Sequence, residues 1–348
     1  MRMITINDIA KEAGVSAGTV DRVLHNRGGV SKKTAEKINA IIKKRNFKTN
    51  KIASSLALNK KLKIATLIPR HDEENTFWKA PLLGTQNAQE NVEKFGITIN
   101  NFSFDQFDAT SYIDAFDALI ASNPDGVIIA PIFTKETTQI TKTLENKNIP
   151  YLFINVDLEG FNNLSFIGQD AFKGGFLAGK LMHLCFKENC SVLIIHTRLN
   201  AENHYAISER IHGFNDYFIN NRISINSTIA NIIDLKNTKQ LKEKLNKILS
   251  DNPSINGIYV PSSRISTIAN CIPSITSKKL ALIGFDSTDQ NIECLTEDKV
   301  SFLISQKPFD QGYKSVIIMS DYLIEKKVPE QKIYSPIEIL TKENINFN

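Results

Sequence analysis

Two hydroxyl side chains and one arginine near the N-terminus have the spacing of a helix face that binds phosphate and base edges. Ser16 and Thr19 stand at the start of a predicted helix over 17–25, where free backbone N–H groups and the helix dipole favour an anion. Arg22 falls on the exposed face of the same helix, and its guanidinium is long enough to reach a base edge, usually that of guanine. Gly18 costs the helix about 0.5–1 kcal/mol relative to alanine, but it allows a close backbone approach. The alternative is that this face is merely solvated.

A second group of polar and aromatic side chains follows predicted strands in the rest of the chain. Ligands of parallel sheets bind beyond the carboxyl ends of the strands, so residues at these ends are the candidates for a small-molecule site. Aromatic rings cover the C–H faces of a polyhydroxylated ligand, and forked polar groups pair with its hydroxyls. Each of these side chains can equally be an ordinary loop residue. The candidates are Asn75, Phe77, Trp78, Asn155, Asp157, Arg210, Ser262 with Ser263, Asp286 and Gln306.

Catalytic and metal-binding motifs are missing from the sequence, which has no G-x-S-x-G, phosphate loop, dinucleotide fingerprint or H-E-x-x-H. Its four cysteines form no C-x-x-C pair, and we expect them to be buried free thiols. We therefore expect no enzyme, no metal and no cofactor. No apolar run approaches the roughly 20 residues of a membrane span, and no signal peptide is visible, which favours a cytoplasmic protein without membrane contact.

Charge divides the chain into a basic head and a mildly acidic body. Residues 1–61 contain 14 Lys and Arg against four Asp and Glu, a net charge of +10, whereas the remainder carries −5. This asymmetry is typical of a nucleic-acid-binding domain joined to a second domain of another kind. A solubilising basic arm is the alternative, but the helical pattern of the head argues against it.

Three helices are predicted in the head. Thr5 with Asp8 resembles a capping box for the first helix, and Gly14 supplies the positive φ that ends it. Ser16 caps the second helix, and Ser31 caps a third that completes the core. Two short helices at a glycine turn with a third helix behind them predict a helix-turn-helix. The expected inner faces carry Ile6, Ile9, Ala10 and Ala13, then Val20, Val23 and Leu24, then Thr34, Ala35, Ile38, Ile41 and Ile42.

The gapless segment Thr-Ile-Asn-Asp-Ile-Ala-Lys-Glu-Ala-Gly-Val-Ser-Ala-Gly-Thr-Val-Asp-Arg-Val-Leu, residues 5–24, resembles the lactose-repressor (LacI) family of bacterial regulators, as do Val30-Ser31 and Thr34. The resemblance implies that Ala17, Gly18 and Arg22 select the operator sequence. Larger side chains commonly stand at positions 17 and 18 in the family, so the operator itself is not predicted. The phosphate-positioning residues implied by the match are Thr5, Ser16, Thr19, Asn26 and Ser31.

Residues 50–61 are predicted to be a hinge. The segment is too short to hold a stable helix alone in water. The family resemblance implies that it becomes helical on the operator and inserts an apolar wedge into the minor groove, with Ala53 and Leu56 at the matching positions. Thr49 and Ser54 depart from the proline and arginine that are frequent in the family. An ordinary interdomain linker is the alternative.

Strand and helix patterns alternate through residues 62–340, which predicts parallel sheets covered on both faces. The length fits two doubly wound halves, so the predicted fold class is an all-α helix-turn-helix head plus an α/β body of two parallel-sheet subdomains. Predicted strands are 63–69, 97–104, 126–130, 151–155, 191–196, 257–261, 280–285 and 301–305, and predicted helices include 82–95, 112–121, 134–146, 172–186 and 238–249.

The body also resembles the periplasmic sugar-binding proteins, to which the family's effector domain is similar. The segments that carry this resemblance are Asn75-Thr-Phe-Trp78, Arg210-Ile-His-Gly-Phe214, Leu282-Ile-Gly-Phe-Asp286 and Ser305-Gln-Lys-Pro-Phe-Asp-Gln-Gly312. The resemblance implies a head over 1–49, an effector-binding and dimerisation domain over 62–340, and a tail over 341–348. Within the body it implies one subdomain of 62–157 with 287–306 and another of 158–286 with 307–340, with three chain crossings between them.

These observations together predict a transcriptional regulator, and more specifically a repressor. Two heads of a homodimer would read a pseudo-palindromic operator, and a small-molecule effector, a sugar or sugar derivative in preference to a purine, would bind between the subdomains. A periplasmic transport receptor would explain the body but not the basic head. An RNA-binding protein lacks support, because no aromatic stacking motif is present.

Overall fold

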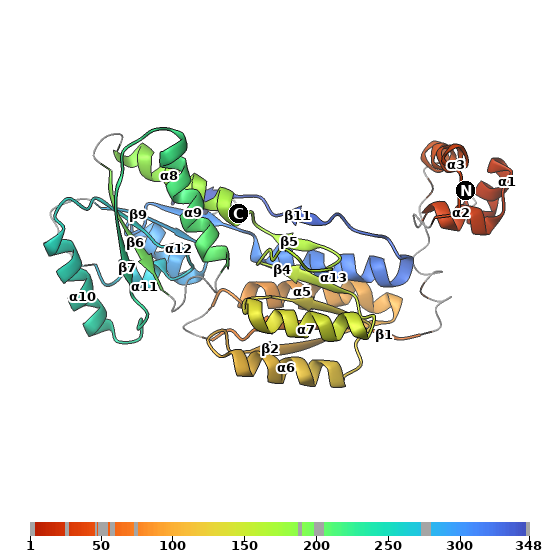
Figure 1. Ribbon diagram of the computed structural model, residues 1–348, viewed down its shortest axis with the longest axis horizontal. Coiled ribbons are helices and arrows are strands. Elements are labelled where there is room, and N and C mark those ends of the chain that lie inside the picture. Colours follow the sequence, from red (N-terminus) through yellow and green to blue (C-terminus); the bar gives the residue numbers. More distant parts are fainter. Residues whose placement is uncertain are drawn as a thin grey trace.

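The chain forms an N-terminal group of three helices followed by two α/β lobes (Figure 1). The computed structural model describes residues 4–24, 28–45, 47, 55, 60–72, 76–186, 190–197, 205–272 and 280–345. Nearly all of the predicted head and body therefore lies in the described part of the chain. The predicted hinge lies largely outside it.

The helices of the head are α1 (Ile6–Ala13), α2 (Ala17–Leu24) and α3 (Lys32–Arg45). The predicted capping box of α1 is formed, because the Thr5 N–H donates to Asp8 Oδ2 at 2.9 Å while the Asp8 N–H donates to Thr5 Oγ1. Gly14 ends α1 with φ 70°. Hydroxyl groups begin the other two helices, where Ser16 accepts from the Thr19 N–H and Ser31 from the Thr34 N–H, both at 3.2 Å.

A single small core joins these helices. Ile9, Val20 and Ile38 contribute one side chain from each helix, and none exposes more than 1% of its surface. Lys37 adds a polar tie between α3 and α1 by donating to the Ala13 carbonyl at 2.8 Å. The predicted helix-turn-helix is confirmed.

The first lobe is a six-stranded sheet in the order β11-β5-β4-β3-β1-β2, with every pairing parallel. The central strands β1, β3 and β4 are almost entirely buried, as expected for a parallel sheet covered on both faces. Helices α6 and α7 contact each other, and α13 lies against α5 and the strands β3, β4 and β5. The elements are β1 (Leu62–Pro69), α5 (Lys79–Val92), β2 (Ile97–Phe104), α6 (Ala109–Ala121), β3 (Gly126–Ile129), α7 (Thr134–Asn146), β4 (Tyr151–Ile154), β5 (Phe166–Gly168), α13 (Pro308–Glu325) and β11 (Lys332–Tyr334), with the 3₁₀ turn η1 (Glu93–Phe95) before β2.

The second lobe repeats this plan with the strand order β12-β10-β9-β8-β6-β7, in which only the β10–β12 pairing is antiparallel among the described residues. Alternate residues of β6 serve opposite faces of the sheet. Val192 and Ile194 pack with α8 and α9, whereas Leu193 and Ile195 pack with α10 and α11. The elements are α8 (Ala171–Phe186), β6 (Ser191–His196), α9 (Tyr205–Asn220), β7 (Asn226–Asn231), α10 (Thr238–Asp251), β8 (Gly257–Tyr259), α11 (Ile265–Ala269), β9 (Ala281–Phe285), α12 (Asp289–Thr296), β10 (Phe302–Ser305) and β12 (Glu338–Leu340).

The boundaries predicted for the two subdomains are wrong, although three crossings between the sheets are present in the described chain. Strand β5 pairs with β4 in the first sheet, so 158–168 belongs to the first lobe and not to the second. Strand β10 pairs with β9, which moves 287–305 into the second lobe. The crossings therefore fall at 169–170, 306–307 and 335–337. Pairing partners decide lobe membership, and the hydrophobic pattern of a strand does not reveal its partner.

All eight predicted strands of the body are confirmed, with boundaries that shift by no more than two residues. The strands that were not predicted are short or polar. β5, β11 and β12 have three residues each, and the edge strand β7 is largely exposed. Among the described helices, none has both the length and the apolar character required to cross a bilayer.

Close contact between α8 and α9 predicts the effect of one substitution. A Cβ atom at Gly175 would lie 1.9 Å from the Arg210 carbonyl oxygen, a backbone atom that cannot move without moving α9. We expect Gly175→Ala to lower the free energy of unfolding by about 1–3 kcal/mol through overpacking. Urea denaturation followed by circular dichroism measures this loss. Lys180→Ala, at an exposed position of the same helix, is the control and is expected to change stability by less than about 0.5 kcal/mol.

Candidate functional site

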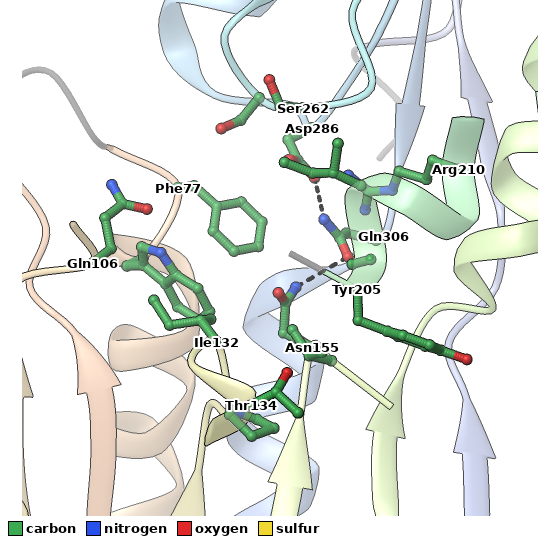
Figure 2. Close-up of a pocket in the computed structure, with 16 residues that line it drawn as sticks. Phe77, Gln106, Ile132, Thr134, Asn155, Tyr205, Arg210, Ser262, Asp286 and Gln306 are labelled. Carbon is green, nitrogen blue, oxygen red and sulfur yellow. Dashed lines mark hydrogen bonds between the residues drawn. The ribbon is translucent and has the colours of Figure 1, made fainter. Parts of the chain in front are cut away.

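A cavity that is open to solvent lies between the two lobes (Figure 2). Its walls come from residues that follow strands of both sheets, as the position of ligand sites on parallel sheets predicts. The predicted site residues that line it are Phe77, Trp78, Asn155, Arg210, Ser262, Ser263, Asp286 and Gln306. The structure thus brings together eight of the ten side chains predicted from the sequence.

Arg210 is the charged centre of the second-lobe wall. Its side chain is buried, its Nη1 donates to the Pro261 carbonyl at 3.1 Å, and its guanidinium lies 3.8 Å from the centre of the Phe285 ring. Burial lowers the pKa of Arg210, although nearby Asp286 opposes this shift. Its Nε atom has no hydrogen-bond partner among the described residues. A buried N–H group without a partner is a point at which a polar ligand atom can bind favourably.

The Gln306 side chain connects the two lobes across the cavity. Its Oε1 accepts from Asn155 Nδ2 at 3.1 Å, and its Nε2 donates to Asp286 Oδ1 at 2.6 Å. Asn155 directly follows β4 of the first lobe, and Asp286 directly follows β9 of the second, while Gln306 lies on a crossing segment. Figure 2 shows these two hydrogen bonds as one continuous chain along the cavity.

Asp286 is a carboxyl group held in unusual surroundings. Burial raises its pKa to about 6, despite the opposing effects of Arg210 and of the hydrogen bond from Gln306. The residue also has φ 72°, a left-handed conformation that aspartate tolerates better than most residues. Because an ionised carboxylate only accepts hydrogen bonds, whereas the neutral form also donates one, Asp286 changes its bonding capacity near pH 6.

The first-lobe wall is aromatic. The rings of Phe77 and Trp78 meet edge to face with their centres 4.9 Å apart, and both side chains are mostly buried. Figure 2 shows Phe77 on the side of the cavity opposite Arg210. A ligand between them would meet an apolar ring on one side and charged hydrogen-bonding groups on the other. Asn75, which was predicted to join this wall, lies outside the described residues.

Asp157 does not line this cavity. Its Oδ2 lies 2.7 Å from the Lys332 ammonium, in a neighbouring hollow between 155–159 and 169–172. The prediction followed from its place just after β4. Asn155 has φ 68°, so the chain turns at this residue and the two-residue repeat of the strand does not continue to Asp157. Asn155 bonds to Gln306, whereas Asp157 pairs with Lys332 of β11.

Several lining residues were not predicted. Gln106 follows β2, and Ile132 and Thr134 follow β3, so the strand-end rule that found the other residues would also have found them. Tyr205 begins α9 and contacts the first-lobe core, a placement that no local sequence pattern indicates.

A second candidate site is the exposed surface of the head. Ala17, Gly18 and Thr19 open α2, and Arg22 is exposed one turn later on the same helix. The Ser16 and Thr19 hydroxyls lie 2.9 Å apart at this N-terminus, and Thr5 and Ser31 occupy the same capping position on α1 and α3. Asn26, Ala53 and Leu56, which were also predicted to contact DNA, lie outside the described residues.

Metal-binding groups are not found in the described part of the chain, where no three His, Cys, Asp or Glu side chains gather at ligating distance. Three of the four cysteine thiols are buried as predicted, whereas Cys185 is exposed. The two candidate sites therefore rest on hydrogen bonding, aromatic contact and charge.

Two family models match the chain, and together they span its head and its body. The model described as bacterial regulatory proteins, lacI family, matches residues 5–50. The model described as periplasmic binding protein domain matches residues 64–327. The second match covers most of the sequence.

Named relatives are similar to this chain, one of them over almost its full length. The ribose operon repressor of Lactococcus lactis subsp. lactis is 24% identical over 351 residues, covering 99% of this chain and 98% of the relative. The sucrose operon repressor of Staphylococcus xylosus is 28% identical over 52% of each chain. Among solved structures, a putative LacI transcriptional regulator from Bacteroides fragilis is 27% identical with a TM-score of 0.75, covering 83% of this chain and all of that one. The glucose-galactose binding protein GanP from Geobacillus stearothermophilus shares the fold, with a TM-score of 0.72 at 21% identity over 82% of this chain and 99% of that one.

The raised pKa of Asp286 predicts a pH dependence of stability. The folded carboxyl keeps its proton up to about pH 6, whereas the unfolded one releases it near 3.8, so the free energy of unfolding falls as pH rises through this window. The loss amounts to about 3 kcal/mol for this group. Asp286→Asn removes the titrating group while keeping an oxygen for Gln306. Urea denaturation at pH 4.5 and pH 7 is expected to show the variant gaining stability relative to the parent at the higher pH, and parallel profiles would contradict the assignment.

Proposed function

Because the chain belongs to the lacI family of bacterial regulatory proteins and carries a periplasmic binding protein domain over most of its length, we propose that it is a repressor controlled by a sugar or sugar derivative. Two ribose operon repressors and a sucrose operon repressor are among the relatives that it matches, and none of these three names is that of an enzyme. The head supplies DNA binding, and the cavity between the lobes is the effector site of this proposal.

The observation that carries the effector proposal is the pairing of an aromatic wall with forked polar groups. Phe77 offers an apolar ring to C–H groups, while Arg210 donates hydrogen bonds to hydroxyls and Asp286 accepts them. The names of two relatives, a ribose and a sucrose operon repressor, support a sugar as the effector. Aromatic stacking also suits a purine, which a binding panel separates from a sugar. Ser262 and Ser263 supply small hydroxyls to the same cavity.

In this proposal the head contacts DNA through α2. The hydroxyls of Thr5, Ser16 and Ser31 sit at helix N-termini, where phosphate oxygens are favoured, and Arg22 reads a base edge. Ala17 and Gly18 keep the helix surface small, and Asn26, Ala53 and Leu56 extend the contact along the chain. We place the domain boundaries at 1–49 for the head, 50–61 for the hinge, 62–340 for the body and 341–348 for the tail.

A homodimer completes the proposal. One head buries little surface on DNA, whereas two linked heads on two half-sites gain affinity through their effective concentration. The protein would act in the cytoplasm, on the nucleoid. The effector would alter the angle between the lobes, and hence the spacing of the heads, by bending at the three crossings.

Arg22→Ala tests base reading. Loss of the guanidinium is expected to reduce the preference for operator over scrambled duplex by about 10- to 100-fold, the worth of one good base contact. Fluorescence anisotropy on duplexes selected from a random library by the parent protein measures both affinities. Arg22→Lys is the matched variant, because it keeps the charge without the fork, and it is expected to lose discrimination while retaining the salt dependence. Full discrimination in Arg22→Ala would refute the reading role.

Arg210→Met tests the effector site. The substitution keeps an apolar contact with Phe285 but removes the buried donors, so we expect at least a 10-fold loss of effector affinity with operator affinity preserved. A thermal-shift panel of monosaccharides, disaccharides and nucleobases identifies the ligand with the parent protein, because binding to the folded state raises Tm. An unchanged response of the variant to that ligand would show that the site lies elsewhere.

A further inference from the structure

The Arg22 side chain does not extend freely from α2. Its Nη1 donates to the carbonyl oxygen of Gly28 at 3.1 Å, so the guanidinium rests on the turn that precedes α3. Gly29 lies directly beneath the same atom, because a Cβ built at this position would be 2.8 Å from Arg22 Nη1. The Gly28–Gly29 backbone thus forms a contact surface for the guanidinium, which we call the seat. A shift of either glycine would displace the guanidinium.

The seat requires glycine at position 29 for two separate reasons. Its φ of 92° lies in the left-handed region, which side chains with a Cβ disfavour. A Cβ would also occupy the space that the guanidinium takes. Because that neighbour is the far end of a flexible side chain, the guanidinium would move away and the fold would remain. Gly14 has a similar φ of 70°, but no atom lies within 4 Å of a Cβ built at this position. Glycine is therefore required at position 14 only for the backbone conformation.

The seated guanidinium keeps most of its capacity to bind a base. Arginine has five N–H donors, and the contact with Gly28 uses one of them. Nη2 and the second Nη1 hydrogen are donors that this contact does not use, and they match the two acceptors on the major-groove edge of guanine. An arginine also loses considerable side-chain freedom when it is fixed in a complex, and a preformed contact reduces that loss.

We propose that Gly29 is a positioning residue for operator recognition, which holds the Arg22 guanidinium in place through the Gly28–Gly29 backbone before DNA is bound. The inference rests on the proposed reading role of Arg22. Gly29 touches no base in this proposal and acts only through that side chain.

The test is a double-mutant cycle between positions 22 and 29 in the full-length protein. Gly29→Ala is expected to weaken binding to the selected operator duplex by about 2- to 10-fold, the worth of ordering one long side chain. Affinity for scrambled duplex and the slope of affinity against salt are expected to stay unchanged, since no phosphate contact is lost. In the Arg22→Ala background the same substitution is expected to have no further effect on discrimination.

Two further variants separate positioning from strain. Gly29→Asn introduces a Cβ with less backbone strain, since asparagine tolerates positive φ, and it is expected to reproduce the loss. Gly14→Ala introduces comparable strain in the same domain without touching Arg22, and it is expected to lower Tm without altering the operator preference of the folded protein.

Each contrary outcome overturns a different claim. An equal loss from Gly29→Ala with and without Arg22 would show a purely structural glycine. Tighter operator binding by Gly29→Ala would show that the seat withholds Arg22 from DNA. If Arg22→Ala removes discrimination and Gly29→Ala leaves it unchanged, the positioning role of Gly29 is refuted while the proposed function is retained. If Arg22→Ala keeps discrimination, both the base-reading role of Arg22 and the positioning role of Gly29 are refuted.

Discussion

The arrangement of the cleft depends on the two hydrogen bonds of the Gln306 amide, because they connect this side chain to both lobes. The oxygen accepts from Asn155 of the first lobe, and the nitrogen donates to Asp286 of the second. Gln306 is 2% exposed, and a buried polar atom that loses its partner costs about 1–3 kcal/mol. Separating the lobes, or placing a hydroxyl between these groups, therefore exchanges one set of hydrogen bonds for another. Because these buried polar atoms must keep hydrogen-bond partners, the angle between the lobes is linked to the occupancy of the cleft.

Backbone conformation and helix packing position the polar side chains of the cleft around Gln306. Asn155 and Asp286 each follow directly on a buried strand, and both have positive φ, 68° and 72°, so the chain turns sharply at the edge of each sheet. Arg210 arrives on α9, whose approach to α8 is fixed by the missing side chain of Gly175. These positions belong to rigid elements, so the cleft groups are held in place before a ligand binds. Such preorganisation lowers the entropy that binding has to overcome.

The head was predictable almost completely, because capping residues and helical periodicity act over a few neighbouring positions. Thr5 with Asp8, Ser16 and Ser31 each begin a helix as predicted. The strands of the body were also predictable, but their pairing was not, since β5 and β10 join sheets that only distant contacts decide. The same limit applies to the cleft. The strand ends predicted Asn155 and Asp286. The orientation of Asp157 and the position of Tyr205 at the cavity depend instead on packing between elements far apart in sequence.

The chain links the cleft to the head through the first lobe, and this shapes how an effector can act. Gln306 is followed by Lys307, with φ 51°, and then by α13, which packs against α5 and the first sheet. That sheet contains β1, whose first residue, Leu62, comes directly after the predicted hinge. A ligand that rearranges the bonds of Gln306 thus acts on the lobe that is joined to the DNA-binding head. The coupling is reciprocal, so an effector that lowers operator affinity is itself bound more weakly by the operator complex, by the same factor. Whether the effector releases or retains DNA is then decided by which lobe angle the operator-bound heads require, because a ligand shifts an equilibrium only by its differential affinity for the two states.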